Sequence, residues 1–356
     1  MYRLFLLPFF AFLCLSCFRE VPAQWESVLG TVCGVNLFEG GTKAEYDAVF
    51  AEFRRVEGIM AFTPASSGPK GEGATALDLI NQNAGIRPVQ APEELLDVLE
   101  RACYYAELSA GAFDPTVGPL VRLWGIGGES PRLPSAAGIQ EALDLVDWKD
   151  LLIDRKAGTA FLRRRGQALD LGAIAKGYAA DRAAAIIREK TGLPGVFRLP
   201  VKRRAIIDLG GNIFALGERR GRKNWRIGIQ DPLRERGVYL GVLELKDKSV
   251  VTSGVYERVF EEGGRRYHHI LSTRDGYPVW NGLLSVTIIA DSSTDADALS
   301  TAAFALGLEK GLALVESLPD TEAIFVREDR AVVVSSGTLF KLLDDGDYRL
   351  VSVTAP

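Results

Sequence analysis

Ala168-Leu-Asp-Leu-Gly-Ala-Ile-Ala-Lys-Gly-Tyr-Ala-Ala-Asp-Arg-Ala-Ala-Ala185 is the stretch that decides the fold. Its apolar first residues lead to Asp170 and Gly172, and an alanine-rich segment of strong helix formers follows and carries Lys176. This order predicts a strand, a glycine turn and a helix start, where backbone N–H groups and a lysine can meet a phosphate or a metal. Taken alone, the pattern is more typical of an ordinary strand-to-helix junction with a solvated lysine.

A second apolar stretch, residues 205–208, also finishes in Asp-Leu-Gly, so we expect two glycine turns near one site. Four further stretches carry chemistry: Gly111-Ala-Phe-Asp-Pro-Thr-Val-Gly-Pro-Leu120, Thr252-Ser-Gly254, His268-His-Ile270 and Asp295-Ala-Asp-Ala-Leu-Ser-Thr301. Together with Asp170-Leu-Gly-Ala-Ile-Ala-Lys-Gly-Tyr178 and Asp208-Leu-Gly-Gly-Asn212, and in this order along the chain, they resemble the ApbE family, the FAD:protein FMN transferases. The resemblance extends from Gly30 to about Gly307.

The order of the local patterns predicts an α+β fold, because helical signals are grouped early and antiparallel strand signals come later. The resemblance implies a mixed, largely antiparallel sheet with packed helices, in one large domain of two intimate lobes that spans residues 25–356. Thr42 and Glu45 form a capping-box pattern before an amphipathic helix. We expect residues 25–38 to form one strand and residues 129–140 to form a surface linker. The absence of a Gly-x-Gly-x-x-Gly after a first strand argues against a dinucleotide-binding Rossmann unit.

Composition excludes one class of partner. The 356 residues include 42 basic and 46 acidic side chains, for a formal net charge of -4. Acids and bases are mixed along the chain without a basic stripe, so a nucleic-acid partner is not expected.

A chain of this length can bury a sizeable core.

The N-terminus has the pattern of a targeting segment. Arg3 precedes an apolar run that is too short for a permanent membrane anchor. Leu15-Ser16-Cys17 resembles the end of a bacterial lipoprotein signal, which predicts a signal peptide at 1–16, a lipidated Cys17 and a tether at 17–24. Cleavage after Ala23 is the alternative. On the lipoprotein interpretation, the protein is anchored by lipid on the periplasmic side of the inner membrane.

Two cysteines lie beyond the signal. Cys33 falls in a predicted strand and Cys103 on the apolar face of a predicted helix. Both residues are typical of small buried hydrophobes. The sequence leaves open whether they form a disulfide.

Asp297 and Thr301 form the candidate metal site. They are four residues apart at a predicted helix start, so their oxygens share one face. A carboxylate and a hydroxyl are hard ligands that suit Mg²⁺ better than zinc. The resemblance implies the carbonyl of Ala173 as a third ligand. The structural alternatives are a carboxylate that offsets the helix dipole and a hydroxyl satisfied in the core.

The resemblance also implies the residues that bind FAD, the substrate. Leu29 stands where the family has a methionine, a replacement of similar volume. The tyrosine that the family places against the flavin is missing near 61–63, and Phe62 is the one ring available there. The residues carried over from the family are Leu29, Ala112, Phe113, Asp114, Asp170, Lys176, His269 and Leu271.

Three side chains are the candidates for catalysis: Asp297, Lys176 and His269. A metal on Asp297, with Lys176 beside it, would neutralise charge on the FAD pyrophosphate as AMP departs. His268 and His269 are adjacent in a strand, so they point to opposite faces. The resemblance favours His269 as the base or phosphate ligand. A structural edge-strand histidine is the alternative.

Three functions follow from these residues. The first is an Mg²⁺-dependent transfer of FMN from FAD to a Thr or Ser of a flavoprotein in a membrane electron-transport complex. The second is hydrolysis of FAD to FMN and AMP, with water in place of the acceptor. The third is a non-catalytic FAD-binding lipoprotein, against which the Asp297–Thr301 pair argues.

Overall fold

The computed structural model describes residues 21–38, 41–62, 74–128, 130–189, 203–219, 221, 223–343 and 346–351. The predicted signal peptide, Cys17 and the residues from Thr63 to Gly73 lie outside this part of the chain. None of the described helices is long and apolar enough to cross a membrane.

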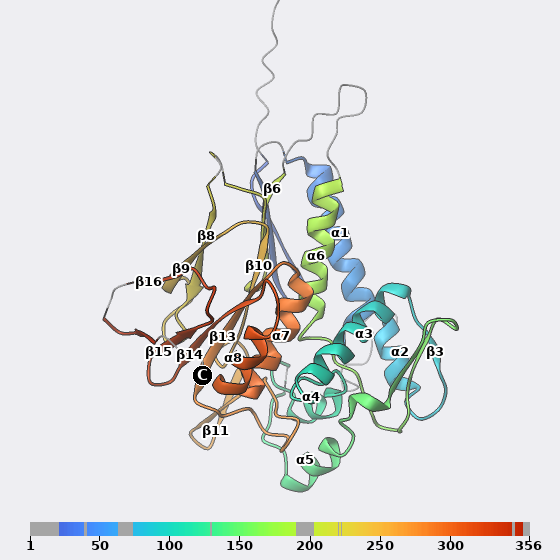
Figure 1. Ribbon diagram of the computed structural model, residues 1–356. Coiled ribbons are helices and arrows are strands. Elements are labelled where there is room, and N and C mark those ends of the chain that lie inside the picture. Colours follow the sequence, from blue (N-terminus) through green and yellow to red (C-terminus); the bar gives the residue numbers. More distant parts are fainter. Residues whose placement is uncertain are drawn as a thin grey trace, which may run out of the picture.

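A large sheet forms the centre of the molecule (Figure 1). Neighbouring strands are antiparallel throughout, except that the last two pair in parallel. This arrangement confirms the predicted α+β class with a largely antiparallel sheet. In spatial order its described strands are β1 (Gln24–Val28), β2 (Thr31–Phe38), β6 (Arg204–Leu209), β7 (Asn212–Leu216), β10 (Lys248–Gly254), β13 (Leu283–Ala290), β14 (Glu322–Arg327), β15 (Ala331–Val334) and β17 (Arg349–Val351).

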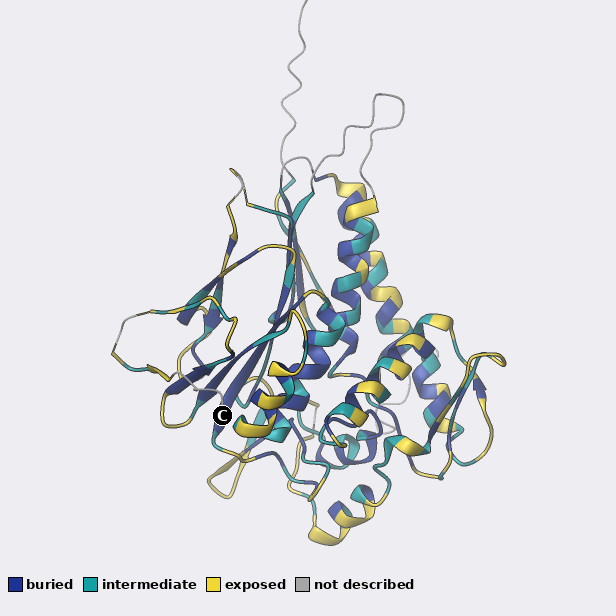
Figure 2. Cartoon of the chain, in the orientation of Figure 1, coloured by how far each residue is buried: buried dark blue, intermediate teal, exposed yellow. Residues whose placement is uncertain are grey.

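Helices cover one face of this sheet, and the main hydrophobic core lies between the two layers. The helix α6 (Ala175–Glu189) packs between α1 (Lys43–Met60) and α7 (Ser293–Leu306), and α8 (Leu308–Glu316) follows α7 and packs against it. Every residue of β13 is buried, which follows from its cover on both faces (Figure 2).

A small three-stranded sheet covers the other face. Its strands are β16 (Phe340–Leu342), β9 (Tyr239–Leu245) and β8 (Trp225–Gln230), in that order. Trp225, Ile227 and Ile229 alternate inward along β8 and pack against a second core with Val250 and Ile324 of the large sheet. The large sheet is therefore enclosed between helices and a second sheet.

The remaining elements form the second lobe, in which helices gather beside a small sheet (Figure 1). The hairpin β11 (Val259–Glu262) and β12 (Arg265–His268) lies against this lobe through a third core that contains Trp124 and Tyr267. The other elements are α2 (Ala76–Gln82), β3 (Val89–Gln90), α3 (Glu93–Leu108), α4 (Gly118–Trp124), α5 (Ala136–Leu143), the 3-10 turn η1 (Trp148–Asp150), β4 (Leu151–Asp154) and β5 (Thr159–Leu162).

Local sequence explains how α1 begins and which face it buries. The Thr42 hydroxyl accepts a hydrogen bond from the backbone N–H of Glu45, whose carboxylate accepts one from the Thr42 N–H. This capping box was predicted from the sequence. The amphipathic helix predicted after it is also confirmed, because the apolar face formed by Tyr46, Val49, Phe50, Phe53 and Val56 is buried in the core.

Two local predictions were wrong. Residues 25–38 form a hairpin instead of one strand, because Leu29 and Gly30 adopt φ values of 57° and 65° and reverse the chain. A pair of left-handed residues is the geometry that suits a two-residue hairpin turn. The expected linker at 129–140 contains the start of α5, which begins after Ser135, whose hydroxyl accepts from the Gly138 N–H.

Cys33 and Cys103 are both free thiols. Cys33 is fully buried in β2, whereas Cys103 is half-buried on α3. Burial raises the pKa of each thiol to about 12. Cys33 and Cys103 are therefore not joined by a disulfide, a point that the sequence left open.

Candidate functional site

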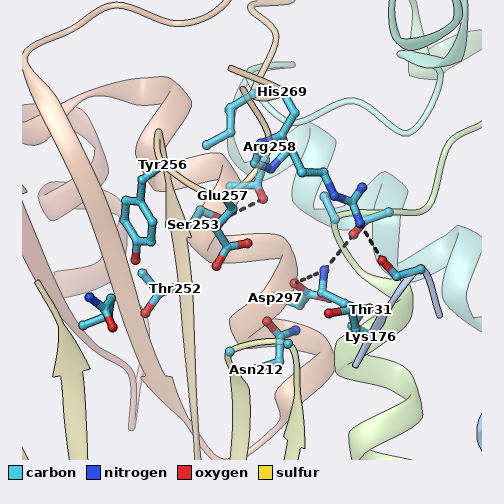
Figure 3. Close-up of a pocket in the computed structure, with 18 of the residues that line it drawn as sticks. Thr31, Lys176, Asn212, Thr252, Ser253, Tyr256, Glu257, Arg258, His269 and Asp297 are labelled. Carbon is cyan, nitrogen blue, oxygen red and sulfur yellow. Dashed lines mark hydrogen bonds and ion pairs between the residues drawn. The ribbon is translucent and has the colours of Figure 1, made fainter. Parts of the chain in front are cut away.

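A cavity of about 790 Å³ lies at the end of the large sheet, where both Asp-Leu-Gly turns meet the helices (Figure 3). Its walls come from segments far apart in the sequence: the β1–β2 turn, residues 112–126, the start of α6, the β6–β7 turn, the β8–β9 connection, residues 250–258, residues 269–273 and α7. The expectation that the two glycine turns lie near one site is confirmed.

The turn that leads into α6 is held in place by the loop before α4. The Asp170 N–H donates to the Pro115 carbonyl at 2.8 Å, and the Gly118 N–H donates to the Ala168 carbonyl at 3.1 Å. Asp170 accepts from the Gly172 N–H at 2.7 Å. Burial raises the pKa of the Asp170 carboxyl, and the Gly172 N–H and nearby cations oppose that rise.

Lys176 lies on the first turn of α6 and lines the cavity beside Asp297 (Figure 3). Its ammonium donates to the Gly172 carbonyl at 3.1 Å and stands 3.8 Å from Oδ1 of Asp297. A lysine and a carboxylate on two different helices thus converge at one end of the cavity. This pairing places a positive charge close to the carboxylate predicted to bind a metal.

Asp297 is buried on α7, with 3% of its surface exposed. Its Oδ2 accepts the backbone N–H of Gly177 at 2.9 Å. Only glycine fits there, because a Cβ on Gly177 would lie 2.2 Å from the Ser293 carbonyl oxygen. Close contact between α6 and α7 therefore fixes one carboxylate oxygen and leaves the other facing Lys176.

A carboxylate on α6 also orients α7. Asp181 accepts hydrogen bonds from the backbone N–H groups of Ser293 and Thr294 at 2.8 and 2.9 Å, and from the Ser292 hydroxyl at 3.0 Å. A carboxylate at this position satisfies free N–H groups and offsets the helix dipole. The register between the two helices, and hence the position of Asp297, depends on this contact.

Thr301 lies one turn after Asp297 and lines the same cavity. Its hydroxyl is 3.2 Å from that of Ser253 on β10, which in turn is 2.8 Å from the Ser300 hydroxyl. Ala173 also lines the cavity. The structure thus brings together the three residues predicted as metal ligands. The described residues hold no cluster of three or more His, Cys, Asp or Glu side chains that could bind a metal.

The two histidines point in different directions, as predicted, but they do not share a strand, because β12 ends at His268 and His269 follows it. His268 is buried; its Nε2 lies 2.9 Å from the Val279 carbonyl, and its Nδ1 accepts the Ile270 N–H at 3.3 Å. Burial lowers the pKa of His268 to about 4. The ring is neutral at pH 7, with Nε2 as the donor.

His269 follows β12 and faces the cavity (Figure 3). Its Nδ1 is buried and has no hydrogen-bond partner in the described part of the chain. Burial lowers the pKa of His269 to about 3, and the positive charges of Arg258 and Lys176 contribute to that shift. The imidazole is therefore neutral at pH 7 and available as a hydrogen-bond acceptor or donor.

The remaining predicted contacts divide into two groups. Ala112, Phe113, Asp114 and Leu271 line the cavity. Leu29 does not: it packs against the main core, and its N–H donates to Glu57 at 2.7 Å. Gly30 and Thr31, the next two residues, take the place at the wall that we expected for Leu29.

Asp114 has a structural part as well as a place in the wall. Its Oδ1 accepts from the N–H and hydroxyl of Thr116 at 2.7 and 2.6 Å, and its Oδ2 accepts the Trp148 N–H at 3.0 Å. Burial raises the pKa of this carboxyl, and those hydrogen bonds lower it. Asp114 therefore holds the loop from 112 to 118 in shape.

Several cavity residues were missed in the sequence. Tyr256, Glu257 and Arg258 follow β10 and face the cavity (Figure 3), and Arg236 enters from the β8–β9 connection. Desolvation raises the pKa of the Glu257 carboxyl, and nearby cations oppose the rise. These residues lie in irregular connections without a spacing signal, and Thr252-Ser253-Gly254 was the nearest motif.

Phe62 does not line the cavity. Its ring packs against the main core and lies 5.1 Å from the guanidinium of Arg122, a cation–π distance. The suggestion that Phe62 replaces a flavin-stacking tyrosine is therefore not supported.

Comparisons with known proteins agree with this geometry. A model of the ApbE family matches residues 29–325. An FAD:protein FMN transferase of Treponema pallidum is 38% identical, over 88% of this chain and 86% of its own length. One of Klebsiella pneumoniae is 38% identical, over 86% and 90%.

Solved structures resemble the whole fold. An ApbE protein of Thermotoga maritima superposes with a TM-score of 0.76 at 32% identity, over 90% of this chain and 96% of its own. The flavin transferase ApbE of Vibrio cholerae gives 0.74 at 25% identity, over 88% and 96%. Because the family model and these relatives match most of its length, this chain belongs to the ApbE family.

Proposed function

We propose that this chain is an FAD:protein FMN transferase. A hydroxyl oxygen of an acceptor protein attacks the phosphorus of the FMN half of FAD. A new P–O bond to the acceptor forms as the P–O bond to AMP breaks. The relatives that match over most of their length carry this name, and the cavity gathers the required groups.

The cavity suits a flavin dinucleotide in size and charge. Its volume falls in the range of roughly 300–1,000 Å³ typical of small-molecule sites. Lys176 and Arg258 supply positive charge toward a diphosphate, and the lining also includes apolar groups such as Phe113 and Leu271 for a ring system. Electrostatic stabilisation of the departing phosphate is the main contribution expected of such a site.

The residues fit Mg²⁺. Asp297 and Thr301 offer hard oxygen atoms on one helix face, and the Ala173 carbonyl belongs to the same wall. Oδ1 of Asp297, which faces Lys176 at 3.8 Å and accepts no backbone N–H, is the oxygen that would bind the metal, since Oδ2 is held by the Gly177 N–H. When bound, the metal neutralises negative charge on the phosphoryl oxygens. Water and substrate would complete its coordination.

His269 is the group to which we assign the acceptor's proton. Its unpaired Nδ1 in the cavity wall supports this assignment. A pKa of about 3 makes it a weak base in the free protein. The negative charge of a bound diphosphate raises the pKa of a neighbouring imidazole, so binding of FAD would strengthen the base.

The convergence of Lys176, Asp297 and Thr301 on one cavity is the observation that carries the proposal. The test incubates the protein with FAD and Mg²⁺, with and without an acceptor flavoprotein domain. Flavin fluorescence on a denaturing gel and AMP are then measured. Flavin on the acceptor supports transfer. AMP released without an acceptor indicates FAD hydrolysis instead. If neither product forms, the protein binds FAD without catalysis.

We also propose that the protein acts as a lipoprotein on the periplasmic side of the inner membrane, on flavoproteins of membrane electron-transport complexes. The sequence pattern that ends at Cys17 supports this location. Substitution Cys17→Ser should release the protein from the membrane fraction, and unchanged fractionation would contradict lipid anchoring.

A further inference from the structure

Asn212 is a buried amide in the cavity wall for which the sequence suggested no role. It is the first residue of β7, directly after the turn formed by Gly210 and Gly211, whose φ values are 67° and 102°. Only 3% of its surface is exposed, and it lines the cavity. The glycine turn therefore presents this one side chain at the end of the sheet.

The side-chain amide of Asn212 is unsatisfied. Its Nδ2 has no hydrogen-bond partner in the described part of the chain. The half-buried amide of Asn81 differs, because its Nδ2 donates to the Leu169 carbonyl at 3.0 Å and its Oδ1 accepts the Leu169 N–H at 2.7 Å. Since buried polar groups in proteins are nearly always paired, an unpaired amide facing a cavity indicates a ligand.

The strand pattern shows which side of the sheet Asn212 faces. Phe214, two residues further along β7, belongs to the core beneath the helices, whereas Ile213 belongs to the opposite layer. Alternation along a strand places Asn212 on the helix side with Phe214. Figure 3 shows its side chain near Asp297 and Lys176, away from Tyr256.

We propose that Nδ2 of Asn212 donates a hydrogen bond to an oxygen of the FAD diphosphate, next to Lys176. This inference rests on the proposed function for the identity of the ligand. The charged end of the cavity already holds a carboxylate and an ammonium. A neutral amide adds a donor there without adding charge, and phosphoryl oxygens only accept hydrogen bonds.

The test replaces Asn212 with leucine, which is close to asparagine in shape and cannot donate. Asn212→Ala is the second variant, which adds no atoms to the site. Calorimetric titration measures the binding of FAD and of riboflavin, which lacks the diphosphate. Both variants should bind FAD about ten- to a hundredfold more weakly, as expected for a lost hydrogen bond to a charged group, and should bind riboflavin as the wild type does.

Melting temperature separates a binding role from a structural one. Removing an unpaired amide should leave the melting temperature of the ligand-free protein unchanged or higher in Asn212→Leu. The matched control Asn81→Leu breaks two satisfied hydrogen bonds and should melt at a lower temperature. If both Asn212 variants melt as low as the control, Asn212 is structural and the proposal is wrong.

The other outcomes are equally decisive. Unchanged FAD affinity in the variants overturns the proposal, and an equal loss for riboflavin and FAD moves the contact from the diphosphate to the flavin ring. A wild type that binds FAD but transfers no FMN contradicts the proposed function and leaves the Asn212 contact standing. A wild type that binds no FAD contradicts both.

Discussion

The backbone N–H of Gly177 donates a hydrogen bond to Oδ2 of Asp297 at 2.9 Å and so ties the first turn of α6 to the second turn of α7. The same turn carries Lys176, whose ammonium faces the other oxygen of that carboxylate. One contact between two helices therefore sets both the anionic ligand and the cation of the candidate site. Its geometry depends on a glycine that no larger residue can replace.

Asp297→Asn should abolish most of the turnover. The amide can still accept the Gly177 N–H but loses the negative charge that a metal needs. We expect AMP release from FAD to fall at least about 100-fold, with a melting temperature close to that of the wild type. Asp295→Asn is the control on the same helix, because Asp295 pairs with Arg101 and does not line the cavity. Similar rates in both variants would remove the argument for the metal.

Gly177→Ala should destabilise the protein. The new Cβ would lie 2.2 Å from the Ser293 carbonyl oxygen, so α6 and α7 must separate. Overpacking of this kind costs about 1–3 kcal/mol, which denaturant unfolding can measure. The control is Gly58→Ala on α1, where an added Cβ would meet no atom outside the local helix backbone within 4 Å. That variant should be stabilised by about 0.5–1 kcal/mol. Equal effects at the two sites would contradict the close contact.

His268 should make the protein less stable in mild acid. Its folded pKa of about 4 lies below the unfolded value near 6.5, so the unfolded chain binds the proton more readily. The stability that neutral His268 contributes to the free energy of unfolding is present above pH 6.5 and is lost as the pH falls toward 4. Between pH 7 and 5 the loss is about 2 kcal/mol.

The check compares urea unfolding of the wild type and His268→Asn at the two pH values. Between pH 7 and 5, the free energy of unfolding of the variant should fall by about 2 kcal/mol less than that of the wild type. His269 is present in both proteins, so its own contribution cancels. An identical pH dependence would mean that His268 is not held neutral by burial.

Cys33 and Cys103 should react slowly with alkylating reagents in the native protein. Burial raises the pKa of both thiols to about 12, so few thiolates exist at pH 7.5. Peptide mapping after iodoacetamide treatment should find both sites labelled only after denaturation, with or without reductant. Labelling that requires a reductant would show a disulfide, against the free thiols seen here.

The sequence predicted those parts of the fold that depend on local spacing. The Thr42 capping box, the buried stripe of α1, and the shared face of Asp297 and Thr301 all follow from helical periodicity. The reversal at Leu29 was not predicted, because leucine rarely adopts a positive φ and the stretch lacks the usual Asn-Gly signal.

The cavity wall beyond the motifs could not be predicted for a different reason. Arg236 and Glu257 are brought to the site by the order of strands in two sheets, which local patterns do not encode. The glycine turn in Asp208-Leu-Gly-Gly-Asn212 was recognised in the sequence. The proposed binding role of Asn212 depends on its missing hydrogen-bond partner, which only the packed structure reveals.

A crystal structure of the protein with FAD and Mg²⁺ tests the central claim most directly. The account predicts that the FAD diphosphate lies beside Lys176, with a cation on Asp297 and Thr301 and Nδ2 of Asn212 within hydrogen-bond distance of a phosphoryl oxygen. FAD bound outside this cavity, or bound in it with the diphosphate away from Lys176 and Asp297, would contradict the account.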